Sequence, residues 1–194
     1  IGLAGTNIKK SKKNVKGGIN GLGAKVANVH SVVFEVETVD DKMYYRQEFR
    51  DRLREIMLPT VATLSSLKKT APELGPERLR PHTRVSYIPA YAELGYKNGL
   101  SAKDAAEIET WLCLRTHQSA AYVGPKVEVT FNGKRCATTS VESLASLIME
   151  SYGEDADQSV MLTGSMKSTN DEFKAYPWSV AVIVLPPGVK AGRR

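Results

Sequence analysis

The sequence has few of the residues from which catalytic and metal centres are usually built. Its 194 residues include three histidines, His30, His82 and His117, which lie far apart and match no catalytic or zinc-binding pattern. We therefore expect structural roles for them, no catalytic residues and no metal site. Cys113 and Cys136 are isolated, as is typical of small buried hydrophobic residues in a reducing compartment, and a disulfide between them stays open.

Long apolar runs are also absent. No run approaches the roughly 18 residues that a membrane-spanning helix needs, which argues against a transmembrane protein. The opening IGLAGTNIKK becomes cationic before the apolar core of a signal peptide can develop. We expect no membrane contact, while Ile1 leaves open whether further residues precede it.

Acidic side chains are missing from the first 30 residues, which contain six lysines. The remaining 21 cationic residues equal the 21 acidic ones, so the whole formal charge of +6 lies in this segment. Six glycines and no aromatic residue predict that it is mobile until bound, because it cannot bury enough apolar surface to offset its ordering entropy. We interpret it as a flexible basic arm that contacts a DNA or RNA backbone or a neighbouring subunit. The contacting residues would be Lys9, Lys10, Lys12, Lys13, Lys16 and Lys25.

The stretch GGINGLGAK, Gly17–Lys25, superficially suggests a phosphate-binding loop. A Walker loop requires G-x-x-x-x-G-K-[ST] after a strand, whereas nothing strand-like precedes these glycines and no Ser or Thr follows the lysine. A dinucleotide fingerprint needs a helix after the glycines, and none clearly opens there. The sequence therefore favours a flexible arm over a nucleotide site, and we expect no cofactor.

Two acidic clusters and one cationic–aromatic segment are further candidates. Asp40-Asp41 and the run 154–157 offer oxygen ligands without the spacing of a calcium loop, so solvated turns are favoured. The second cluster could also receive the basic arm of a neighbouring copy. The segment RPHTRVSYIPAY mixes cations with aromatic residues, as nucleic-acid surfaces do, but a half-buried strand and loop is the favoured interpretation.

Periodicity and capping signals predict an α+β fold. Helical spacing predicts helices over 45–57 and 61–69, and capping residues predict helices after Ser101, with Ile108, Trp111 and Leu112 facing inward, and after Ser140. Strands are predicted at 31–39, 84–88 and 178–186, the last buried on both faces, with a type I′ hairpin around Asn132-Gly133. We expect a single α+β domain with an antiparallel sheet component and three or four helices. Its parts would be an arm (1–30), a body (31–189) and a basic tail (190–194).

One stretch resembles a known family. Residues 45–69, followed by KKTAPELGPERLRPHTRVSYIPAYAELGYKNG, are similar to small head–tail joining or tail-completion proteins of tailed phages. The corresponding residues are Ala71-Pro72, Gly75, Leu79-Arg80 and Tyr91-Ala92-Glu93-Leu94-Gly95. This resemblance implies a structural ring component at the portal or tail of a virion, without catalysis.

The sequence thus leads to the expectation of a non-enzymatic structural protein of a virion. Its neutral body would self-associate and contact other virion proteins, and its arm would neutralise phosphates without reading sequence. The expected location is the virion, with the host cytoplasm during assembly. The alternative is a ribosomal or other ribonucleoprotein component, and an enzyme without a recognisable motif ranks third.

Overall fold

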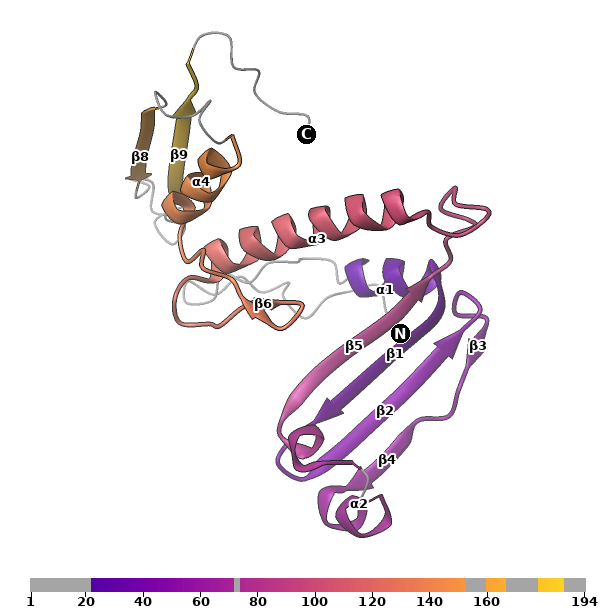
Figure 1. The fold of residues 1–194 in the computed structure, drawn as a ribbon. Coiled ribbons are helices and arrows are strands. Elements are labelled where there is room, and N and C mark those ends of the chain that lie inside the picture. Colours follow the sequence, from indigo (N-terminus) through magenta and orange to yellow (C-terminus); the bar gives the residue numbers. More distant parts are fainter. Residues whose placement is uncertain (1–21, 72–73, 153–159, 167–177, 187–194) are drawn as a thin grey trace. The chain divides into compact units, whose positions relative to one another are not determined.

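The computed structural model describes residues 22–71, 74–152, 160–166 and 178–186. The chain divides into two compact units, residues 1–100 and residues 101–194, and each is described by itself. Their helices and strands are labelled in Figure 1.

The first unit is built on an antiparallel sheet. Its strand order is β3-β2-β1-β5, and β4 also pairs with β2. The strands are β1 (Ser31–Val39), β2 (Met43–Arg50), β3 (Glu55–Ile56), β4 (Thr60–Thr63) and β5 (His82–Pro89). Helix α1 (Leu22–Val29) precedes β1, helix α2 (Leu64–Thr70) follows β4, and the short 3-10 helix η2 (Pro76–Leu79) precedes β5. Figure 1 shows α1 and α2 at opposite ends of this sheet.

The strand predicted at 31–39 is confirmed, and the one predicted at 84–88 is confirmed within the longer β5. The helix predicted over 45–57 is wrong, because β2 pairs with β1 along the strand and the chain then turns into β3. Tyr45 and Phe49 are four residues apart, a spacing that places side chains on one face in both a helix and a strand. The turn itself is left-handed, with positive φ at Asp51, Arg52 and Leu53.

The helix predicted over 61–69 begins later than expected. Val61 lies in β4, where it pairs with Tyr45 of β2, and α2 starts only at Leu64. Thr63 caps this helix, since its hydroxyl accepts a hydrogen bond from the backbone N–H of Ser66. The first residues of the predicted helix therefore form a strand of the sheet instead.

Apolar side chains fix these elements at two places. On one face of the sheet, the ring of Phe34 lies 6.3 Å from that of Phe49 and 6.1 Å from that of Tyr87, measured between centroids. At the end of the sheet near α2, a buried cluster comprises Val39, Tyr44 and Leu67. Leu64 of α2 and Leu79 of η2 pack against the same cluster, so both helices are held at the end of the sheet where β5 begins.

The second unit confirms most of the predicted local signals. Helix α3 (Ala102–Val123) begins with a capping box between Ser101 and Asp104. The hairpin of β6 (Thr130–Phe131) and β7 (Lys134–Arg135) turns at Asn132-Gly133, where φ is 49° and 75°. Such a turn requires positive φ at both positions. Helix α4 (Val141–Glu150) is capped by Ser140.

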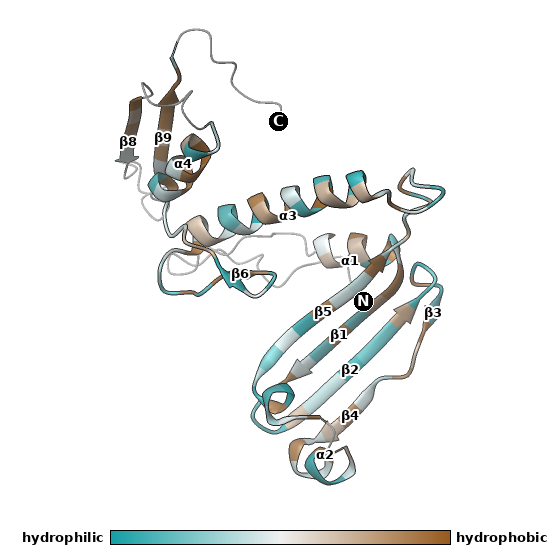
Figure 2. Ribbon diagram, in the orientation of Figure 1, coloured by the Kyte–Doolittle hydropathy of each residue, from teal (hydrophilic) through white to brown (hydrophobic). Residues whose placement is uncertain are grey.

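Burial in the second unit differs from what the sequence predicts. Trp111 and Leu112 of α3 were expected to face inward, but their exposed fractions are 63% and 52%. Strand β9 (Trp178–Val184) pairs with β8 (Val160–Met166) and contacts α4 on one side, whereas Val180, Val182 and Val184 are about half exposed. The prediction that this strand is buried on both faces is therefore wrong within the described residues. Figure 2 shows that β9 is apolar along most of its length, as is the first part of β8.

The α+β class with antiparallel sheets and three or four helices is confirmed, since the described residues contain four α-helices. The predicted division into an arm, a body and a tail stays a prediction. Most of the arm, the acidic run 154–157 and the tail lie outside the described residues, while residues 22–29 of the arm form α1.

Candidate functional site

Only one of the predicted nucleic-acid contacts lies in the described part of the chain. Lys25 is in α1, whereas Lys9, Lys10, Lys12, Lys13 and Lys16 lie outside the described residues, so the structure does not test whether the six lysines come together. Helix α1 carries no acidic residue in its first turn and contacts β1 and β5. A role for the six lysines in binding nucleic acid stays a prediction.

The glycine-rich stretch leads directly into a helix. Gly17, Gly18 and Gly21 precede α1, and Gly23 and Lys25 lie within its first turn. The expectation that no helix opens here is therefore wrong, and with it one of the reasons for rejecting a phosphate site. The first backbone N–H groups of a helix have no partner within the helix and carry partial positive charge, so glycines followed by a helix N-terminus favour anions.

A second polar site surrounds a carboxylate that the sequence does not single out. Glu37 lies in the middle of β1 and its side chain has an exposed fraction of 0%. It faces Arg46 of β2 and Arg84 of β5 in the strand register. An ionised carboxylate buried this deeply requires hydrogen bonds and opposite charges.

Four side chains satisfy Glu37. Tyr44 Oη donates to Oε2 at 2.9 Å, and Arg78 Nη2 from η2 donates to the same oxygen at 2.6 Å. His82 Nε2 lies 3.0 Å from Oε1, and Arg84 Nη1 lies 3.6 Å from that oxygen. Residues from β2, η2 and β5 thus converge on one strand position.

Both ring nitrogens of His82 lie against hydrogen-bond acceptors. Its Nδ1 lies 2.8 Å from the backbone carbonyl oxygen of Arg80, which can only accept, so Nδ1 carries a hydrogen. Its Nε2 faces a carboxylate oxygen of Glu37, which also accepts when ionised. Both ring nitrogens are thus engaged within the chain, one by a backbone carbonyl and the other by the buried carboxylate.

Burial and hydrogen bonding act in opposite directions on Glu37. Burial raises the pKa of its carboxyl group, but hydrogen bonds from the neighbouring side chains outweigh this effect and leave the pKa below the usual value of 4.5. The pKa of Tyr44 is raised instead, because its phenol is buried and donates to the Glu37 carboxylate. The site therefore keeps Glu37 ionised and Tyr44 neutral at ordinary pH.

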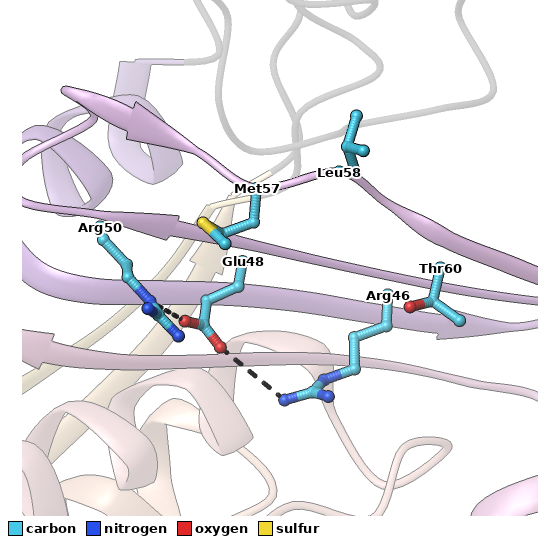
Figure 3. Close-up of a pocket in the computed structure, with 6 residues that line it drawn as sticks. All are labelled: Arg46, Glu48, Arg50, Met57, Leu58 and Thr60. Carbon is cyan, nitrogen blue, oxygen red and sulfur yellow. Dashed lines mark hydrogen bonds and ion pairs between the residues drawn. The ribbon is translucent and has the colours of Figure 1, made fainter.

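A shallow pocket of about 160 Å³ lies beside β2, β3 and β4. Figure 3 shows the residues that line it, which are Arg46, Glu48, Arg50, Met57, Leu58 and Thr60. Glu48 pairs with Arg50 and lies 3.9 Å from Arg46 Nη2. The acidic side chain between the two arginines compensates much of their charge, which makes this pocket a weaker candidate for an anion than the surroundings of Glu37.

Other candidates from the sequence remain dispersed. Within the described ranges no group of three or more His, Cys, Asp or Glu side chains could hold a metal ion. His117 Nδ1 instead lies 3.0 Å from Thr138 Oγ1, and Cys113 and Cys136 are both free thiols. Asp40 accepts backbone hydrogen bonds in the β1–β2 turn, as expected of a turn residue. No helix in the described part of the chain is long and apolar enough to cross a membrane.

The cationic–aromatic segment is more exposed than expected. The side chains of Arg80 and Arg84 are 72% and 48% exposed, and the residue Tyr87 is 52% exposed. In the alternation of β5, however, Arg84 and Tyr87 lie on opposite faces of the sheet. Arg84 is therefore placed with Glu37, and the tyrosine is stacked on Phe34.

Comparison with known proteins relates nearly the whole chain to one kind of enzyme. It is 36% identical over 184 residues to DNA topoisomerase 2 of African swine fever virus (isolate Pig/Kenya/KEN-50/1950), a match of 95% of the chain. It is 34% identical over 98 residues to DNA topoisomerase 2 of Acanthamoeba polyphaga mimivirus, a match of 49% of the chain. The chain spans only 14% and 7% of the lengths of these two relatives. No family model matches it.

Solved structures of topoisomerase II ATPase regions have a similar fold. The ATPase region of Saccharomyces cerevisiae topoisomerase II bound to ICRF-187 matches with a TM-score of 0.66 and 23% identity, over 92% of this chain and 40% of that one. The ATPase and transducer domains of DNA topoisomerase II from Balamuthia mandrillaris match with a TM-score of 0.58 and 23% identity, over 84% of this chain and 39% of that one.

These comparisons correct the functional expectations. The resemblance to phage head–tail proteins is wrong, since the proteins that match most of the chain are named DNA topoisomerase 2. The expectation of a non-enzymatic capsid, connector or ribonucleoprotein component is wrong for the same reason, because the relatives are enzymes. The phage resemblance rested partly on a helix over 45–69, most of which is strand and turn. Over 95% of its length the chain is similar to a segment of a viral DNA topoisomerase 2, and its fold is similar to part of a topoisomerase II ATPase region.

Proposed function

We propose that this chain is a segment of a type II DNA topoisomerase that spans parts of its ATPase and transducer domains. The observation that carries the proposal is the 36% identity over 184 residues to viral DNA topoisomerase 2. The fold supports the assignment to this region, because the yeast ATPase region matches 92% of the chain and therefore parts of both units.

ATP, the nucleotide that an ATPase region uses, would bind at the N-terminus of α1. Glycines at 17, 18, 21 and 23 allow a close approach of the backbone, and the helix N-terminus directs N–H groups at a phosphate. A β-carbon built at Gly23 meets no atom within 4 Å in the described residues. A substitution there therefore meets no atom of the described residues, and it would obstruct a ligand that approaches the backbone.

The test is ATP binding by the 194-residue chain, measured by isothermal titration calorimetry. Gly23→Ala is expected to weaken ATP binding at least about tenfold, because the methyl group displaces a phosphate from the backbone. The same change leaves folding intact or slightly improves it, since Ala is favoured over Gly in a helix by about 1 kcal/mol. Lys25→Met is expected to weaken ATP binding through loss of charge near the phosphates.

Lys68→Met provides the matched control, because Lys68 is an exposed lysine of α2 at the other end of the sheet. It should bind ATP as the unaltered chain does. Equal ATP binding by the unaltered chain and the Gly23→Ala variant would count against a nucleotide site at the N-terminus of α1.

Self-association and action on DNA follow as proposals for the whole protein. The name of the viral relatives supports DNA as the substrate, whereas partnership with other virion proteins has no support in them. The viral origin of these relatives supports the host cytoplasm as the place of action. Contact of the six lysines with a DNA backbone remains compatible with this function and is tested by the salt dependence of DNA binding.

A further inference from the structure

The surroundings of Glu37 contain more positive than negative charge. Arg78 and Arg84 contribute two positive charges, and Glu37 contributes one negative charge. Arg46, the other neighbour in the strand register, is directed to Glu35, with its Nε 2.8 Å from that carboxylate. The local excess is thus not cancelled by a second acid within the cluster.

The geometry leaves donors of this cluster available. Glu37 is fully buried, whereas the side chains of Arg78 and Arg84 are 40% and 48% exposed. Each guanidinium carries five N–H donors, and the contacts with Glu37 use few of them. Arg78 Nε is buried and has no hydrogen-bond partner among the described residues. Because Nε is shielded from solvent, its N–H reports on the site without itself being the atom that a ligand contacts.

We infer that Arg78 and Arg84, positioned by the buried Glu37, form a binding site for a phosphate group. A phosphate accepts bidentate hydrogen bonds from arginine and matches the local positive charge. Glu37 acts as a positioning residue, because its carboxylate contacts both Arg78 of η2 and Arg84 of β5 and so holds the two guanidinium groups close together. This inference does not rest on the proposed function, since α1 and the Glu37 cluster share no residue.

The phosphate can come from a free anion or from a nucleic-acid backbone, and two arms of one experiment separate these sources. In the first arm, inorganic phosphate is titrated into the 194-residue chain while the Nε–Hε signal of Arg78 is followed by NMR. In the second arm, a labelled duplex of roughly 20 base pairs is bound at several salt concentrations and followed by fluorescence anisotropy.

Arg84→Gln is the informative variant, because Arg84 makes a single ion pair at 3.6 Å and its loss leaves the hydrogen bonds of Glu37 in place. Phosphate affinity is expected to fall about tenfold, and the salt slope of DNA binding to decrease by about 0.9 if the ligand is a backbone phosphate. Arg84→Lys keeps the charge and should retain the slope. Arg54→Gln is the matched control, as Arg54 is an exposed arginine of the same unit paired with an aspartate.

The outcomes divide cleanly. Loss in the phosphate arm alone supports a site for small anions, and loss in the DNA arm supports a site for the nucleic-acid backbone. If Arg84→Gln and Arg54→Gln behave alike in both arms, the inference is overturned. Gly23→Ala should leave both arms unchanged, so failure of the ATP assignment and failure of this site are distinguishable.

Discussion

At the scale of single residues, two glutamates of the same strand illustrate how burial decides the value of a charge. Glu35 and Glu37 both lie in β1 and both pair with arginine. Glu35 is 17% exposed and pairs with Arg46, which is 45% exposed, whereas Glu37 is fully buried and receives hydrogen bonds from Tyr44 and Arg78. Exposed ion pairs are screened by water and contribute little, whereas an unsatisfied buried partner is costly.

We expect Glu37→Gln to destabilise the first unit by about 2–4 kcal/mol, because it leaves Arg78 without its counter-charge. The free energy of unfolding, measured with urea, reports the loss. Glu35→Gln is the control and should cost less than about 1 kcal/mol. Equal losses in the two variants would show that Glu37 is no more important than a surface ion pair.

The pH dependence of stability follows from the lowered pKa of Glu37. Its pKa is lower in the folded chain than the usual 4.5, so the ionised carboxylate favours the folded state. This stabilisation is complete above pH 4.5 and is lost as pH falls through the folded pKa. Urea unfolding at about pH 7 and about pH 3.5 should show a larger acid-induced loss for the unaltered chain than for Glu37→Gln. Parallel pH profiles would contradict the assignment.

At the scale of secondary structure elements, local hydrogen bonds set the beginnings of helices. The Ser101 hydroxyl accepts from the backbone N–H of Asp104, and the Asp104 carboxylate accepts from the backbone N–H of Ser101. This reciprocal pair satisfies two donors that have no partner inside α3. The same signal is readable from the sequence because it involves residues only three apart.

Removal of this cap provides a test of the element. Ser101→Ala should destabilise α3 by about 1 kcal/mol, since an alanine cannot accept the hydrogen bond at the N-cap. Ser119→Ala serves as the control within the same helix, because the Ser119 hydroxyl merely donates back to the carbonyl of Arg115. Circular dichroism during thermal unfolding measures both effects. A larger loss for the Ser119 variant would exclude a capping role for Ser101.

At the scale of the whole molecule, the chain consists of two compact units that meet in sequence at Leu100 and Ser101. The segment between β5 and α3 is formed of turns and carries Gly95 and Gly99 with positive φ. Exposed turn segments are preferred sites of proteolytic cleavage, whereas paired strands resist it.

We therefore expect limited trypsin digestion to cut after the exposed Lys97 faster than after Arg46 or Arg50, which lie within the paired strand β2. Mass spectrometry identifies the fragments, one for each unit. Lys97→Gln should remove this cut without accelerating those in β2. Early cleavage in β2 would contradict the sheet topology of the first unit.

Features that depend on neighbouring residues could be predicted from the sequence. The strand at 31–39, the Asn132-Gly133 hairpin and the helix caps at Ser101 and Ser140 follow from backbone preferences and short-range hydrogen bonds. The tertiary fold, in contrast, makes residues 43–50 a strand, because the spacing of Tyr45 and Phe49 fits both a helix and a strand and the pairing with β1 selects the strand. It alone also brought Glu37 together with Arg78 and His82, which are 41 and 45 residues away. Such a cluster cannot be predicted from the sequence, since its members are far apart along the chain and meet only when the strands pair.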